Sequence, residues 1–185
     1  MSVEVVVAAA RACFAAGGIS GARMDDIARH AGVSRAHLYA FVSGRPELIK
    51  LAAMARLGEL GQLLSDRMRE SELDLEDSIV EQVLATARAG REDPEFVALA
   101  EAIPRFELNE ILTSADSPVH EINSRIFGPV LGRAMTEGRL RTDVPIDAIV
   151  EWLQRILASE AGRAHVDDEA LRVTVRRFVL PAILT

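Results

Sequence analysis

Apolar residues recur at helical spacing from one end of this chain to the other. Two C-terminal segments, residues 146–157 and 171–183, show the pattern most clearly, with apolar residues three and four positions apart. No segment shows the sustained alternation of β-branched residues that a half-buried strand needs. The sequence therefore predicts an all-α fold.

Glycine and proline divide the first part of this pattern into separate helices. Gly17-Gly18 end the first apolar stripe, and the next two helical segments, 24–31 and 35–42, are short. Pro46 suits the first turn of a long helix from Arg45 to about Met68, because its missing N–H is not needed there. Further along, prolines at 94 and 104 break the chain into short pieces, and another helix is expected from Ser117-Pro118 to Gly138.

Composition restricts where such a chain can work. No run of uncharged apolar residues reaches the roughly 18 that span a bilayer, and the first residues lack the order of a signal peptide. A cytoplasmic protein with no membrane partner is therefore expected. Cys13 is the one cysteine, which excludes an intramolecular disulfide and a cysteine cluster for a metal. We expect Cys13 to be a small buried apolar residue.

Charge is unevenly distributed along the chain. Residues 1–50 carry five Arg and one Lys against four acidic residues, a net charge of +2. The remainder carries 15 basic and 24 acidic residues, a net charge of −9. A mildly basic head on an acidic body suits a protein that contacts DNA at one end. The boundary falls inside the long helix, and the predicted domains are a DNA-binding domain, 1–45, and a helical body, 46–185.

Residues 24–42 have the pattern of a helix-turn-helix. Ala28 is small where the two helices would cross, Gly32 can adopt the left-handed conformation of the turn, and Ser34 can cap the second helix. The positions that must be apolar in the small core are Ile27, Ala31, Val33, Leu38 and Phe41. The second helix is therefore expected to enter a major groove of duplex DNA.

Residues left free to face outward are the candidate DNA contacts. Together with Ser34, they are Arg35, Ala36, His37, Tyr39 and Ala40. Arg45 and Lys50 begin the next helix and are expected to hold backbone phosphates, with ordinary surface charge as the alternative. Solvated residues on a small helix are the alternative for the first group.

The stretches 26–28 and 31–34, together with Leu38-Tyr39, Phe41 and Glu47-Leu48, resemble the DNA-binding head of the tetracycline-repressor (TetR) family. The resemblance covers about residues 3–55, and residues 138–144 resemble the approach to that family's eighth helix. It implies a three-helix head, joined through the long helix to a body that binds a small-molecule effector and dimerises. Such a regulator, most often a repressor, binds an operator in double-stranded DNA as a homodimer and is released by its effector.

The sequence departs from the family's pattern at Ala22-Arg23, at Ala40, and at Val42, which replaces the usual aromatic residue. Ala22-Arg23 stands where the family usually has threonines that cap the second helix and hold a phosphate. Arg23 is therefore the expected phosphate contact, through its charge. Ala40 replaces a longer, often basic residue, so each head has fewer base contacts available.

The less ordinary residues of the body are candidates for the effector pocket that the resemblance implies. They are Met68, Phe106, His120, Asn123, Phe127 and Trp152. The alternative is core packing for the aromatic residues and Met68, and surface exposure for the polar pair.

The last two helices carry a stripe that is too apolar to face water at a chain end, and we expect it to pair with its copy across a two-fold axis. The predicted interface residues are Leu153, Leu157, Leu171, Val175, Phe178, Val179 and Ile183.

Motifs of enzymes are missing from the sequence. It has no glycine-rich phosphate loop, no G-x-S-x-G elbow and no H-E-x-x-H pair, and its histidines are scattered. We therefore expect no catalytic residue, no metal and no cofactor. The alternative to a DNA-binding regulator is a helical protein that binds a small molecule or a partner and no longer reads DNA.

Overall fold

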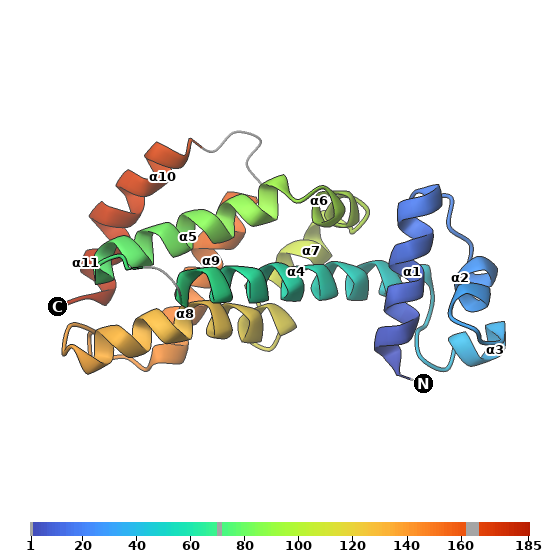
Figure 1. Ribbon diagram of the computed structural model, residues 1–185, viewed down its shortest axis with the longest axis horizontal. Helices are drawn as coiled ribbons and strands as arrows, with labels where there is room; N and C mark the ends of the chain where they lie inside the picture. Colours follow the sequence, from blue (N-terminus) through green and yellow to red (C-terminus); the bar gives the residue numbers. More distant parts are fainter. Residues whose placement is uncertain (1, 70–71, 162–166) are drawn as a thin grey trace. The chain divides into compact units, whose positions relative to one another are not determined.

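The fold is helical throughout the residues that the computed structural model describes, which are 2–69, 72–161 and 167–185 (Figure 1). This part of the chain contains no strand, which confirms the predicted all-α class. The helices are α1 (Val3–Gly17), α2 (Met24–His30), α3 (Arg35–Leu38), α4 (Arg45–Arg69), α5 (Leu75–Glu92), α6 (Pro94–Glu101), α7 (Arg105–Thr113), α8 (Pro118–Thr136), α9 (Ile146–Ala161), α10 (Asp168–Thr174), the π-helical segment η1 (Val175–Val179) and α11 (Leu180–Ile183). In the same residues, no helix is both long and apolar enough to cross a bilayer.

The chain forms two compact units. The first comprises Met1–Leu57 and Asp93–Leu108, and the second comprises Gly58–Glu92 and Asn109–Thr185. The division falls inside α4, so this one continuous helix begins in the first unit and ends in the second. The domain boundary expected at residue 45 stays a prediction.

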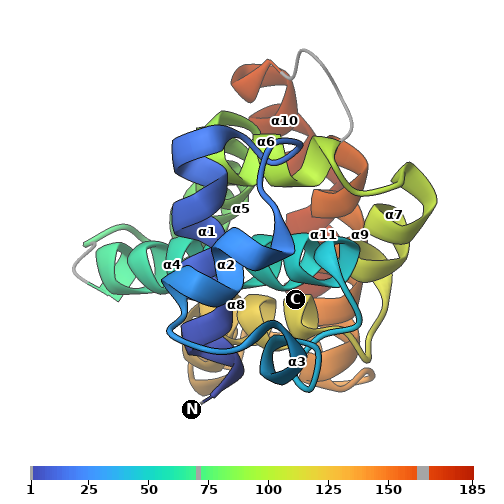
Figure 2. The same ribbon diagram turned by 90° about the vertical axis from the view of Figure 1, so that its right-hand side faces the viewer.

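The first unit packs α1 against α2 and α2 against α3, and Figure 2 shows these N-terminal helices face-on. Its core contains Val6, Ala10, Ile27, Leu38, Leu48 and Ala52, each no more than 2% exposed. A carboxylate fixes the start of α4, because the backbone N–H and the hydroxyl of Ser43 both donate to Glu47 Oε2, at 2.5 and 2.7 Å. This hydrogen bonding lowers the pKa of Glu47.

Ion pairs join α6 to the head within the first unit. Asp93 caps α6 by accepting from the N–H of Phe96 at 2.8 Å, and it also accepts from Arg56 Nε at 3.0 Å. Glu95 accepts from Arg11 of α1 at 2.6 Å. Asp93 is 10% exposed, and its pKa is lowered mainly by Arg56. The segment from Asp93 thus adds a carboxylate pair to the first unit.

The second unit packs α5, α8 and α9 around a core that includes Ile79, Leu84, Phe127, Leu131 and Leu153, each no more than 1% exposed. α4 and α8 approach closely at Gly61, where a Cβ atom would lie 2.7 Å from Ile122 Cγ2. Only a residue without a side chain allows this spacing.

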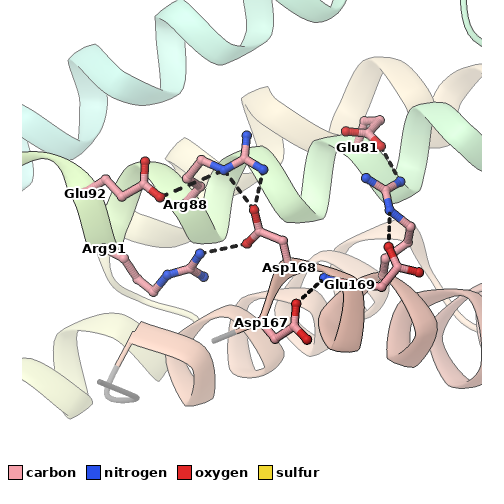
Figure 3. A network of polar contacts seen from close by, with 8 residues as sticks. Glu81, Arg88, Arg91, Glu92, Asp167, Asp168 and Glu169 are labelled. Atoms are coloured by element: carbon pink, nitrogen blue, oxygen red, sulfur yellow. Dashed lines mark hydrogen bonds and ion pairs between the residues drawn. The ribbon is translucent and has the colours of Figure 1, made fainter. Parts of the chain in front are cut away.

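A ladder of ion pairs holds α10 and η1 on α5 (Figure 3). Asp168 accepts from Arg88 Nε at 3.1 Å and from Arg91 at 2.9 Å, and Arg88 is the main cause of its lowered pKa. Closer to the beginning of α5, this helix supplies the acidic partners. Its Glu81 pairs with Arg172 of α10, and its Asp77 pairs with Arg176 of η1. The opposite charge order on the two helices fixes their relative direction.

Two predicted helices differ in detail from the observed ones. α3 is regular only to Leu38, and the chain to residue 41 continues as a tight turn in which Ala40 and Phe41 donate to carbonyls three residues back. The last helical segment, predicted from the apolar periodicity of residues 171–183, contains the π-helical segment η1. Pro181 has no N–H and its ring crowds the carbonyl of Arg177, which explains the widened turn just before it.

Candidate nucleic-acid interface

The turn of the predicted helix-turn-helix has the geometry that its sequence requires. Gly32 has φ +71°, in the left-handed region, and the N–H of Val33 returns to the carbonyl of Ala28 at 2.9 Å. Ala28 is 3% exposed, as the close crossing of α2 and α3 demands. Ser34 caps α3, because its Oγ accepts from the N–H of His37 at 3.1 Å. This local geometry holds α3 at a fixed angle to α2.

The five residues predicted to face outward from α3 and the following turn are all exposed. They are Arg35, Ala36, His37, Tyr39 and Ala40. The ring of His37 packs edge-to-face on the ring of Phe41, with 5.1 Å between the ring centroids, and this contact stabilises the position of the imidazole. Leu38, in the middle of the row, is fully buried and anchors the helix. The surface therefore presents three long side chains and two alanines.

Arg35 is held by two neighbours that the sequence analysis did not connect with it. Its Nη1 donates to Asp25 of α2 at 3.1 Å, and its guanidinium carbon lies 5.7 Å from the centroid of the Tyr39 ring. The Tyr39 hydroxyl and then the Asp25 carboxylate raise the pKa of Arg35. The guanidinium is thus charged and oriented before any ligand arrives.

The predicted phosphate contacts have different surroundings. Arg23 is exposed at the N-cap of α2 and makes no capping hydrogen bond with its side chain. Arg45 donates to the carbonyl of Ser20 at 2.9 Å, which ties the loop after α1 to the start of α4. Lys50 pairs with Glu107 of α7 in the same unit, so its charge is partly neutralised.

The six predicted effector contacts differ in their exposure and in the unit to which they belong. Phe106 is 80% exposed and belongs to the first unit, whereas the other five belong to the second. Asn123 and Phe127 are buried in α8, and Trp152 is half-buried in α9. The side chain of His120 is half-buried, and its Nδ1 has no hydrogen-bond partner in the described structure.

Met68 lines a cavity of about 190 Å³ in the second unit, between α4, α5 and α8. Its polar lining includes Ser65, Gln82 and Arg133. Gln82 is a residue that the sequence analysis missed. A polar residue within the apolar stripe of α5 is the signal that would have identified it.

Most of the predicted interface residues are buried within the single chain. Leu153, Leu171, Val175, Val179 and Ile183 are all no more than 4% exposed. Contacts with α5 therefore cover most of the stripe that was expected to need a second subunit. Phe178 remains 69% exposed, and Leu157 is half-buried. The homodimer itself stays a prediction.

Comparison with known proteins agrees with the geometry of the head. Residues 6–50 match the sequence profile described as "Bacterial regulatory proteins, tetR family". No curated protein matches the chain in sequence.

Solved structures of TetR-family regulators share the fold over nearly the whole chain. The repressor QsdR of R. erythropolis has a TM-score of 0.70 at 19% identity, covering 97% of this chain and 94% of its own. The repressor AlkX of Dietzia sp. strain DQ12-45-1b, implicated in biodegradation of n-alkanes, has a TM-score of 0.65 at 17% identity, covering 96% and 92%. The ketosteroid regulator KstR2 of Mycobacterium tuberculosis has a TM-score of 0.52 at 16% identity, covering 97% and 93%.

Proposed function

We propose that this chain, whose residues 6–50 match the TetR-family profile and whose fold is that of TetR-family regulators, is a non-enzymatic, effector-responsive repressor of that family that binds its operator as a two-fold dimer in the cytoplasm. In this proposal residues 1–45 bind double-stranded DNA, and residues 46–185 bind the effector and dimerise. The exposed row on α3, with Arg35 held between Asp25 and Tyr39, is the observation that carries the proposal. An oriented arginine is the side chain best suited to read guanine in a major groove.

The proposed DNA contacts divide by role. Arg35, His37 and Tyr39 read bases, while Ser34, Ala36 and Ala40 allow the backbone of α3 to approach the groove. Arg23, Arg45 and Lys50 hold phosphates, and Lys50 must exchange Glu107 for a phosphate to do so. Affinity for any duplex then falls as the salt concentration rises.

Dimerisation follows from the shortness of the reading surface. One α3 reaches only a few base pairs, which is too little to single out a site in a genome. A two-fold dimer doubles the contacts and demands half-sites about one helical turn apart, or a multiple of that distance. Phe178 is the proposed centre of the subunit contact, because it is the most exposed apolar side chain of the predicted set.

The effector response rests on α4, which belongs to both units. A ligand that contacts the second half of α4 would favour one conformation of that helix, and the first half of the same helix belongs to the unit that contains α3. Full release of the operator requires a ligand that prefers the DNA-incompetent state by about 10⁴-fold. Binding alone would leave repression unchanged.

Selection of binding sites from a random duplex library tests the proposal. The wild-type chain should enrich a palindrome, and Arg35→Ala should enrich the same spacing with one position of each half-site relaxed. Enrichment of no sequence would favour the alternative, a helical binding protein that no longer reads DNA.

A further inference from the structure

The cavity in the second unit lies where Pro129 interrupts the backbone hydrogen bonding of α8. About one turn before the lining residue Ser65, Gly61 brings α4 close to Ile122 and Ile126 of α8. Proline cannot donate to the carbonyl of Arg125, and Ser65 Oγ of α4 donates to that carbonyl instead, over a long 3.5 Å. Both Ser65 and Pro129 line the cavity. The space is thus built into the backbone and is not a defect of side-chain packing.

Gln82 supplies an unused hydrogen-bond donor to this space. The residue is 2% exposed, lines the cavity, and its Nε2 has no hydrogen-bond partner among the described residues. A buried donor without a partner is unfavourable, and native proteins seldom keep one without a reason. A ligand with an acceptor oxygen would satisfy it.

The charged side chains that line the cavity are all positive. Arg69 and Arg133 are its charged members, and the lining includes no carboxylate. Arg69 pairs with Asp66 at 3.3 Å and Arg133 with Glu137 at 2.8 Å, but both carboxylates lie on the exposed surface outside the cavity. An anion in the cavity would therefore meet two cations at its edge and one amide donor inside it.

The remaining lining is apolar and limits the size of a ligand. Met68, Ile126 and Val130 form this part. The volume of about 190 Å³ is similar to that of an engineered apolar cavity of about 150 Å³ that holds benzene. The space thus suits a compact apolar group with one polar end.

We propose that this cavity binds a small carboxylate, with its apolar part against Met68, Ile126 and Val130 and one carboxylate oxygen accepting from Gln82 Nε2. Arg69 and Arg133 balance its charge. The inference rests on the proposed function in one respect, since it names the chemical class of the effector.

Three probes of similar shape test this ligand class by calorimetric titration of the full chain. Benzoate carries both the charge and the acceptor, benzamide carries a neutral acceptor, and toluene carries neither. The expected order of affinity is benzoate, benzamide, toluene, with at least a tenfold difference between the first and the last. Equal affinities, or no saturable binding of benzoate, would overturn the proposal.

Three variants locate the binding site. Gln82→Met keeps the volume of the side chain and removes the donor, so the benzoate affinity should fall about tenfold while the melting temperature of the free chain is maintained or rises. Arg133→Gln should also weaken benzoate, whereas Arg125→Gln, an exposed arginine of the same helix outside the cavity, should not. Unchanged benzoate affinity in Gln82→Met would overturn the proposal.

Measurement of operator affinity in parallel separates this inference from the proposed function. Benzoate binding that follows the expected pattern and leaves operator affinity unchanged would remove the effector role and support the carboxylate site. Operator binding without the expected benzoate pattern would overturn the carboxylate site and leave DNA recognition standing.

Discussion

Asp25 of α2 and Arg35 of α3 form an ion pair of 3.1 Å across the turn of the helix-turn-helix. The pair fixes the guanidinium near the Tyr39 ring, on the surface proposed to read DNA. Both side chains are more than half exposed, so the pair adds little to folding stability. Its importance lies in the direction in which it holds Arg35.

Asp25→Asn should therefore separate affinity from specificity. Removing a negative charge near the DNA should strengthen binding to random duplex, while a freer Arg35 should discriminate less between operator and random sequence. Competition between the two duplexes measures the ratio of the operator affinity to the random-duplex affinity. The corresponding difference in binding free energy should shrink by part of the about 1–3 kcal/mol that a good base contact provides.

Asp26→Asn is the matched control, because Asp26 pairs with Arg29 of its own helix and not with α3. It should raise affinity for both duplexes and leave their ratio unchanged. The same loss of specificity in both variants would contradict a positioning role for Asp25.

Asp93 should make stability depend on pH. Its pKa in the folded chain lies below its ordinary value of 3.8, mainly because of Arg56. The folded state therefore binds fewer protons, and the stabilisation is complete above about pH 5 and is lost as the pH falls through the folded pKa. Asp93→Asn keeps a cap for α6 but removes the charge, which should lower stability at pH 7 by about 1–3 kcal/mol.

Chemical denaturation between pH 2 and pH 7 tests this expectation. The difference in stability between the wild type and Asp93→Asn should shrink as the pH falls. Asp143→Asn is the control, because Asp143 also has a lowered pKa, through Arg141, but its side chain is 67% exposed. A difference that stays constant with pH would contradict the assignment to the Asp93 charge.

Two glycines of α4 should respond in opposite directions to alanine. Gly58 has open space around its Cβ position, so Gly58→Ala should stabilise the helix by about 0.5–1 kcal/mol. A methyl group at Gly61 would lie 2.7 Å from Ile122 Cγ2, so Gly61→Ala should destabilise the chain by about 1–3 kcal/mol. Equal shifts of the denaturation midpoint would contradict the close approach of α4 and α8.

Phe178→Asp should convert the proposed dimer to a monomer, because a charge at the centre of an apolar contact is costly to bury. Light scattering at micromolar concentration gives the mass directly. Met135→Asp is the control, since Met135 is also an exposed apolar residue, 58% accessible, but lies on α8 outside the predicted interface. A monomeric wild type, or a dimeric Phe178→Asp, would contradict the interface.

Short-range rules predicted the head from the sequence. Gly32, Ala28 and Ser34 act within one turn and two short helices, where residue type alone restricts the backbone. The pairing of Lys50 with Glu107 could not be predicted, because the partners are far apart in sequence and only the fold brings them together.

The body shows the same limit on a larger scale. The apolar periodicity located α9 and α10, but it could not tell whether Val175 and Val179 face another subunit or their own chain. Both choices bury the same stripe, and only the arrangement of α5 decides between them. The cavity was not predicted either, since its lining comes from three helices, with Ser65 on α4, Gln82 on α5 and Pro129 on α8.

An electrophoretic mobility shift with the DNA that flanks the chain's own gene tests the central claim most directly. The wild-type chain should shift this duplex in the presence of excess random DNA, and Arg35→Ala and Tyr39→Ala should each weaken the specific complex by about 1–3 kcal/mol. Arg29→Ala, an exposed arginine on α2, should leave the specific complex nearly as stable as the wild type. Undiminished specific binding by both Arg35→Ala and Tyr39→Ala would contradict the assignment of α3 as the reading helix.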